Sequence, residues 1–137
     1  MALRYAFILG VLIQIAPPVV AQAPAPMLLE SCERVRSLDL DEARLGIPCL
    51  IRGVVTLLPE SPTSFTIDDG TGVWVNMGSE NEIRVRPKDL RVGDIVEVKG
   101  RSHPGLFAPI VLASGVTILG RGELPEPRPF PRLQNSA

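Results

Sequence analysis

Few side chains in this 137-residue chain could do covalent or acid–base chemistry. The only histidine, His103, stands in Ser-His-Pro-Gly, a composition typical of a turn. A nucleophilic pair or a histidine-based zinc site needs partners close to such a residue. The two thiols, Cys32 and Cys49, are far from it in sequence. We therefore expect His103 to be a turn residue, and we expect no enzymatic activity, no metal site and no cofactor.

Two acidic stretches are better explained by local structure than by metal binding. Asp68-Asp69 leads into Gly-Thr-Gly, but it lacks the alternating oxygen ligands and the terminal glutamate of an EF-hand calcium loop. The glycines instead predict a hairpin turn, because glycine tolerates a positive φ. Asp39 and Glu42 have the spacing of a helix capping box, and Gly46 is placed to end that helix.

Cys32 and Cys49 form an even pair, which favours a disulfide wherever a chain is exported. The bond would close a loop of about 17 residues and contribute on the order of 3 kcal/mol in the chain-entropy model. It would also tie the leading helix to the first strand. Two buried free thiols are the alternative, because Cys49 could point into a barrel. We predict the bond.

Trp74 is the side chain best suited to hold a ligand. The valines on either side of it share one face of the predicted strand, so Trp74 and Asn76 point to the other face. If the valines face the core, Trp74 lies on the outer surface, where Arg52 and Thr66 could join it as a stacking platform. The alternative is that Trp74 packs under the N-terminal helices or the proline-rich tail.

One basic group follows the third predicted strand. It could hold an anion or the acidic surface of a partner, although such residues are commonly a solvated loop. Its members are Arg84, Arg86, Lys88 and Arg91.

Residues 1–21, MALRYAFILGVLIQIAPPVVA, have the pattern of a signal peptide. The apolar run that follows Arg4 would form a helix about 18 Å long, too short for a hydrocarbon core of about 30 Å. Cleavage after Ala21 is preferred, since a cut after Ala23 would be followed by proline. An uncleaved membrane anchor is the alternative. We expect cleavage and a periplasmic or secreted protein.

Removing the signal changes the composition. The whole chain has 14 Lys+Arg, 15 Asp+Glu, 45% hydrophobic residues and a mean hydropathy of +0.22. After cleavage it would keep 116 residues, a net charge of −2 and roughly 40% hydrophobic residues, which suits a single globular domain. No later segment is apolar enough to span a membrane. The balanced charge disfavours nucleic acid as a partner, and we expect a monomer.

The segments after residue 46 have the residue types and spacing of β-strands. Five strands are predicted, at 47–58, 64–68, 73–77, 95–100 and 107–119. Helical segments at 28–38 and 39–46 precede them, and the 78–92 connection should hold at most one helical turn. This order predicts an all-β fold, a five-stranded OB-fold-like Greek-key barrel preceded by one or two short helices. A β-sandwich is the alternative, but it normally needs about seven strands.

The boundaries follow from composition. The linker and the start of the first helix occupy 22–32, the OB-fold domain 33–122 and an extended proline-rich tail 123–137. Gly53 inside the first strand predicts a bulge or a tight bend. The last strand should bend at Ser114-Gly115 or at Pro109.

Several stretches, in this order and spacing, follow a known bacterial pattern over roughly residues 33–129. They are VRSL at 35–38, EARLGIP at 42–48, IRGVVT at 51–56, IDDGTGVWV at 67–75, VGDIVEVKG at 92–100, GLFAP at 105–109 and LGRGELP at 119–125. Together they resemble the extracytoplasmic OB-fold module of exported bacterial proteins. In several of those proteins the module is the N-terminal sensory region of a membrane histidine kinase.

The resemblance implies an exported module that binds or interacts without catalysis, using the outer face and loops of the barrel. Its ligand, a protein or a small molecule, is not specified. A further domain follows the module in the larger proteins, so we expect any signalling output here to come from a separate protein. A single-stranded nucleic-acid-binding OB-fold is the alternative, disfavoured by export, by the net charge and by the few aromatic residues.

Overall fold

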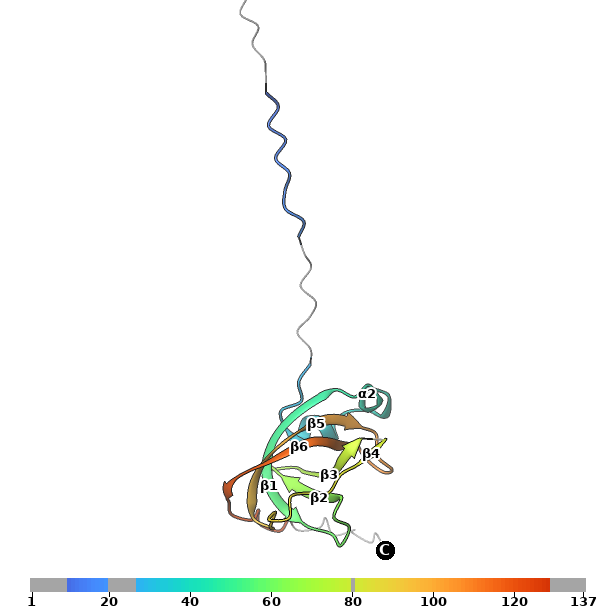
Figure 1. Cartoon of the computed structure of the whole chain (residues 1–137), viewed down its shortest axis with the longest axis vertical. Helices are drawn as coiled ribbons and strands as arrows, with labels where there is room; N and C mark the ends of the chain where they lie inside the picture. Colours follow the sequence, from blue (N-terminus) through green and yellow to red (C-terminus); the bar gives the residue numbers. More distant parts are fainter. Residues whose placement is uncertain (1–9, 20–26, 80, 129–137) are drawn as a thin grey trace, which may run out of the picture.

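The structure is a computed structural model and describes residues 10–19, 27–79 and 81–128. In this part of the chain, two short helices precede a set of strands that curl into a barrel (Figure 1). The elements are α1 (Cys32–Arg36), α2 (Leu40–Arg44), β1 (Pro48–Leu57), β2 (Ser64–Asp68), β3 (Gly72–Ser79), β4 (Glu82–Ile83), β5 (Asp94–His103) and β6 (Ile110–Arg121).

The strands close into a ring in the order β1-β2-β3-β6-β5. All neighbours along this ring are antiparallel except β3 and β6, which run parallel with Val75 opposite Val111. The ring closes because β1 pairs with both β2 and β5. This arrangement confirms the predicted all-β, OB-fold-like barrel. Strand β4, which was not predicted, pairs only with the end of β3.

The core fills the inside of the ring. Strand side chains alternate between the two faces, so every second apolar residue points inward. In β5, for example, Val96 and Val98 are fully buried, while Glu97 between them is only partly buried. Phe65 of β2 is the largest fully buried side chain, and burying a residue of this kind contributes about 2–3 kcal/mol. Helix α1 adds Val35 to the same cluster.

Both helices are short and capped by side chains. Ser31 accepts the first-turn N–H of Arg34 at 3.2 Å and begins α1. In α2 the predicted capping box is present, since Asp39 accepts the N–H of Glu42 at 2.8 Å and Glu42 accepts that of Asp39 at 3.0 Å. Gly46 follows with a φ of +62°, the left-handed conformation that ends helices. Helix α2 therefore delivers the chain directly to β1.

The connection over 78–92 holds the unpredicted β4, and its described part holds no helix, which is within the predicted limit of one helical turn. Other predicted details differ in the structure. The bulge in β1 falls between Val55 and Leu57 and not at Gly53, which is in regular register with β5. The last strand begins at Ile110, three residues after the predicted start. Its irregularity lies opposite the Lys99–Gly100 step, which agrees with the bend predicted at Ser114-Gly115.

Residues 10–19 belong to the predicted signal. They have no regular secondary structure and are exposed, so the helix expected there is not observed over these residues. The predicted cut after Ala21 lies outside the described residues. Within the described part, none of the helices combines the length and apolar character needed to span a bilayer.

Candidate binding site

The outer face of β2 and β3 carries three of the four residues predicted to bind a ligand. Thr66 and Trp74 lie directly opposite each other in the β2–β3 ladder, and Asn76 follows on the same face of β3. Val73 and Val75 point the other way and are buried. Trp74 therefore lies outside the core, with 36% of its surface exposed.

Two hydrogen bonds organise this face. The indole N–H of Trp74 donates to Oδ1 of Asn76 at 2.7 Å, which fixes the ring against its own strand. The hydroxyls of Thr66 and Thr56 lie 2.7 Å apart and extend the polar surface onto β1. With its polar atom already bonded, the ring of Trp74 has only its apolar faces to offer to a partner. The arrangement can bind by stacking.

The fourth predicted residue, Arg52, lies elsewhere. Strand β2 ends at Asp68, which pairs with Val54, so Arg52 lies beyond the end of β2. Its Nε instead donates to Glu97 Oε2 at 2.8 Å across the β1–β5 pair. The sequence placed Arg52 on the correct face of β1 but could not show which neighbouring strand its side chain contacts.

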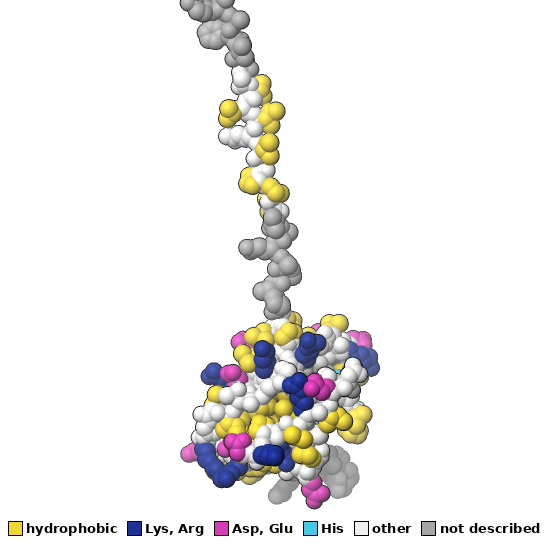
Figure 2. All heavy atoms as spheres, in the orientation of Figure 1, with side chains coloured by type: hydrophobic (Ala, Val, Ile, Leu, Met, Phe, Trp, Pro, Cys, Tyr) yellow, Lys and Arg dark blue, Asp and Glu magenta, His cyan; other side chains and the backbone are white. Residues whose placement is uncertain are grey.

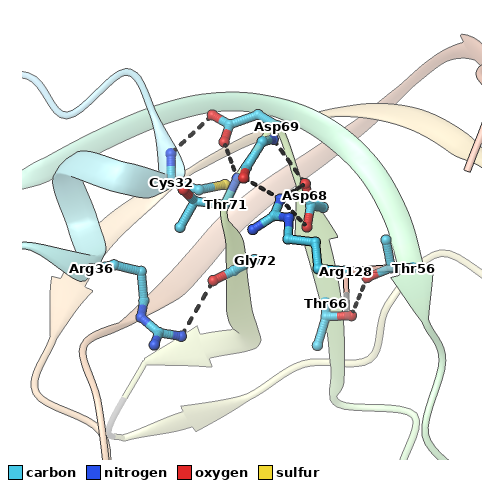
Figure 3. Close-up of polar contacts among 10 residues, drawn as sticks. Cys32, Arg36, Thr56, Thr66, Asp68, Asp69, Thr71, Gly72 and Arg128 are labelled. Atoms are coloured by element: carbon cyan, nitrogen blue, oxygen red, sulfur yellow. Dashed lines mark hydrogen bonds and ion pairs between the residues drawn. The ribbon is translucent and has the colours of Figure 1, made fainter. Parts of the chain in front are cut away.

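The turn between β2 and β3 is held from several sides (Figure 3). Asp68 accepts the N–H of Gly70 at 2.8 Å, as expected for a hairpin turn. Asp69 accepts the backbone N–H of Cys32 at 3.0 Å and so ties the turn to the start of α1. Arg36 of α1 donates to the carbonyl of Gly72 at 3.3 Å. The two aspartates therefore act as anchoring residues, and no cluster of potential metal ligands is found among the described residues.

The proline-rich tail adds a contact that the sequence did not reveal. Arg128 reaches Asp68, with Nη2 at 3.3 Å from Oδ1, and it also donates to the carbonyl of Gly70 (Figure 3). Residues 124–128, together with Thr56 and Asp68, line a shallow hollow of about 400 Å³. The alternating prolines predicted an extended tail, but nothing in them indicated where it lies.

The predicted basic group does not form one anion site. Arg86 is bound internally, with Nη1 donating to the carbonyls of Ser61 at 2.9 Å and Ser64 at 2.7 Å. Arg84 pairs with Glu82 at 3.1 Å, a contact that raises the pKa of Arg84. Lys88 and Arg91 are exposed. Acidic and basic side chains are interspersed on the face of the barrel that Figure 2 shows.

The predicted disulfide is not formed. Cys32 and Cys49 are both free and buried in the core cluster. The thiol of Cys49 lies 3.4 Å from the carbonyl of Ile47, to which it donates. Burial, with the charge of Asp69 as a second cause, raises the pKa of Cys32 to about 12, and burial raises that of Cys49 to about 11. The structure thus corresponds to the alternative of two buried thiols.

No protein-family model matches the chain, and no curated protein matches it. Among solved structures, the chain is similar to the hypothetical protein YgiW from E. coli. The identity is 17%, the TM-score is 0.45, and the similar region covers 66% of this chain and 89% of YgiW. The comparisons give no link to sensor histidine kinases.

Proposed function

We propose that this chain is an exported, non-enzymatic OB-fold binding module that uses the outer face of β2 and β3 as its contact surface. The observation that carries the proposal is the position of Trp74. Its ring lies outside the core, is fixed by Asn76 and stands beside Thr66 on a closed barrel. Exposed aromatic rings on this face of an OB-fold provide stacking surfaces.

Two further observations support parts of this proposal. Residues 1–21 have the charge, apolar run and small residues of an export signal. His103, the only histidine, is the last residue of β5 and not a turn residue as expected, and its Nδ1 accepts the N–H of Gly105 at 3.0 Å. This local contact fits a module without catalysis. We propose that the module acts as a monomer in the periplasm or outside the cell.

The ligand class can be tested through the fluorescence of Trp74, which is the only tryptophan. The mature protein is titrated with oligosaccharides, single-stranded oligonucleotides and small anions. We expect a saturable change with one class. Thr66→Ala should weaken it, whereas Thr117→Ala, an exposed threonine on β6, should not. A response to oligonucleotides that falls with salt would establish the nucleic-acid alternative.

A second measurement can contradict the assignment of the binding surface to β2 and β3. If every ligand that binds by calorimetry leaves the fluorescence of Trp74 unchanged, the outer face of β2 and β3 is not the binding surface. Export is tested separately by the mass of the protein recovered outside the cytoplasm. A chain beginning at Gln22 is expected, and a recovered chain that retains Met1 contradicts cleavage.

A further inference from the structure

A second hollow lies at the end of the barrel that carries α2. Its volume is about 850 Å³, and it is lined by the turn between α2 and β1, the end of β3, the last residues of β5 and the first half of β6. Figure 1 shows α2, β4 and the end of β5 at this end of the barrel. A hollow of this size lies within the usual range for small-molecule sites. We call it the α2 cleft.

The described lining of the α2 cleft is basic. Arg44, Lys99, Arg101 and His103 contribute to it, and none of its described residues is acidic. Lys99, Arg101 and His103 occupy alternate positions of β5, so their side chains leave the strand on the same side. Glu80, between two residues of the lining in sequence, lies outside the described part of the chain.

The charges of Lys99 and Arg101 are not compensated by the described residues. Arg44 pairs with Asp41 at 3.0 Å across one turn of α2. Lys99 and Arg101 form no ion pair and no side-chain hydrogen bond with any residue in the described ranges. By contrast, Arg52 on the neighbouring strand is paired with Glu97. Two uncompensated cations on one side of a strand attract an anion to the cleft.

The wall behind these cations is fixed by one buried side chain. Ser102, 3% exposed, donates to the carbonyl of Ala43 at 3.0 Å and accepts the N–H of Ile47 at 2.8 Å. These bonds hold β5 against the end of α2 and the start of β1. Arg101 lies across the same turn, since its Cδ would be 3.8 Å from a Cβ placed on Gly46. The cationic side chains therefore extend from a rigid base, which favours binding.

We propose that the α2 cleft binds a small anionic ligand through a phosphate group held by Lys99 and Arg101. Arginine can bind two phosphate oxygens at once through its planar guanidinium, and lysine adds a compact charge. Ser79, Asn81 and Ser114 bring hydroxyl and amide groups to the same lining. The proposal does not depend on Trp74 or on what binds the outer face of β2 and β3.

The phosphate could be free or carried by a lipid. Two residues after Pro104, which lines the cleft, the β5–β6 loop exposes Leu106 (92%) and Phe107 (99%). Exposed apolar residues next to cations also occur where proteins contact membranes. The experiment therefore has two arms, pyrophosphate in solution and vesicles of phosphatidylglycerol compared with phosphatidylcholine.

Binding in both arms is measured at low salt with the mature protein, its Lys99→Gln/Arg101→Gln variant and the control Arg34→Gln. Arg34 is an exposed cation on α1, away from the cleft lining, and its removal tests the effect of losing a positive charge elsewhere on the surface. We expect the double variant to bind about tenfold more weakly than the mature protein, the loss typical of charge-assisted hydrogen bonds. Circular dichroism checks that each variant is folded.

Each result of these binding measurements either supports or overturns the proposal. Pyrophosphate binding that the double variant loses supports a free phosphate ligand. Binding to phosphatidylglycerol vesicles alone, lost in the double variant and weakened by Phe107→Ser, supports a lipid headgroup. Absence of binding in both arms overturns the proposal. So does binding that the double variant retains, or binding that Arg34→Gln weakens as strongly as the double variant does.

Discussion

The two candidate surfaces are built in opposite ways. The outer face of β2 and β3 belongs to one hairpin, whose members are neighbours in sequence and in the ladder. The α2 cleft combines α2, the end of β3 and the end of β5, which only the closed barrel brings together. The first surface could be predicted from alternation along two strands, whereas the second required the tertiary structure.

They also differ in what holds them in place. Behind Trp74 the hairpin packs Phe65, Val73 and Val75 into the core, so the face rests on hydrophobic burial. The wall of the α2 cleft depends on a few polar contacts centred on Ser102 and on a very close approach of β5 and β6 at Gly100. Substitutions should therefore affect the two surfaces by different mechanisms and by different amounts.

The largest effect should come from the inner side of the hairpin. Phe65→Ala leaves a cavity in the core and is expected to lower the free energy of unfolding by about 3–5 kcal/mol. Trp74→Ala, on the outer side, should cost about 1 kcal/mol, because most surface substitutions have small effects. Urea unfolding measures both. Equal losses would mean that Trp74 is part of the core and not a surface for partners.

The base of the α2 cleft can be tested with two glycines on paired strands. A Cβ on Gly100 would overlap the carbonyl of Leu112, so Gly100→Ala should cost about 1–3 kcal/mol through forced backbone movement. Gly115→Ala is the matched control, because no heavy atom lies within 4 Å of its Cβ position. Thermal unfolding compares the two variants. Similar melting temperatures would show that β5 and β6 are not tightly packed at the cleft.

The two buried thiols, Cys32 of α1 and Cys49 of β1, should make the free energy of unfolding depend on pH. Their folded pKa values, about 12 for Cys32 and about 11 for Cys49, lie above the ordinary thiol value of 9.0. Above pH 9 the unfolded chain loses thiol protons that the folded chain keeps, so the free energy of unfolding falls as pH rises towards 11–12. Below pH 9 this contribution is fully present.

The measurement is urea unfolding at pH 7.5, 9 and 10.5, with a Cys32→Ala/Cys49→Ala variant as the comparison. Other groups titrate in this range, so the difference in slope between the two proteins is the readout. The variant should lose less stability with pH. Equal slopes, or folded-state thiols that react as fast as those of the denatured protein, would contradict the buried position of both cysteines.

The smallest effect is expected at the edge of the hairpin. Arg128→Ala removes an exposed ion pair with Asp68 and should change the free energy of unfolding by less than about 0.5 kcal/mol. It should nevertheless speed the cleavage of residues 123–128 by proteinase K, because the tail loses its side-chain anchor. Arg34→Ala serves as the control. Unchanged cleavage would show that Arg128 does not hold the tail against the turn.

Local rules explain how much of the fold the sequence could predict. The capping box of Asp39 and Glu42 and the turn after Asp68 depend on spacings of a few residues, and both were predicted. The two-residue β4 has no such signal, since it pairs only with Gly78 and Ser79 at the end of β3. The bulge position in β1 is likewise decided by how β1 fits between two partner strands.

The candidate site also contains features that the sequence could predict and features that it could not. Trp74, Thr66 and Asn76 share a face because alternation along a strand is local. The partners of Arg52 and Arg86 are fixed by strands and loops that lie far apart in sequence, so their bonds to Glu97 and to the carbonyl of Ser64 could not be predicted. For the cysteines, an even count and expected export favoured a bond, but count alone gives no distance between two sulfur atoms.

The parallel pairing of β3 with β6 has a consequence for the folding order. Strand β6 bonds to β3 and to β5, so both strands present an unpaired edge until it docks. Unpaired edges are templates for pairing between molecules. The Val75–Val111 pair joins positions far apart in sequence, and such long-range contacts form later than hairpins. The period of greatest aggregation risk should therefore fall between formation of the β2–β3 hairpin and docking of β6.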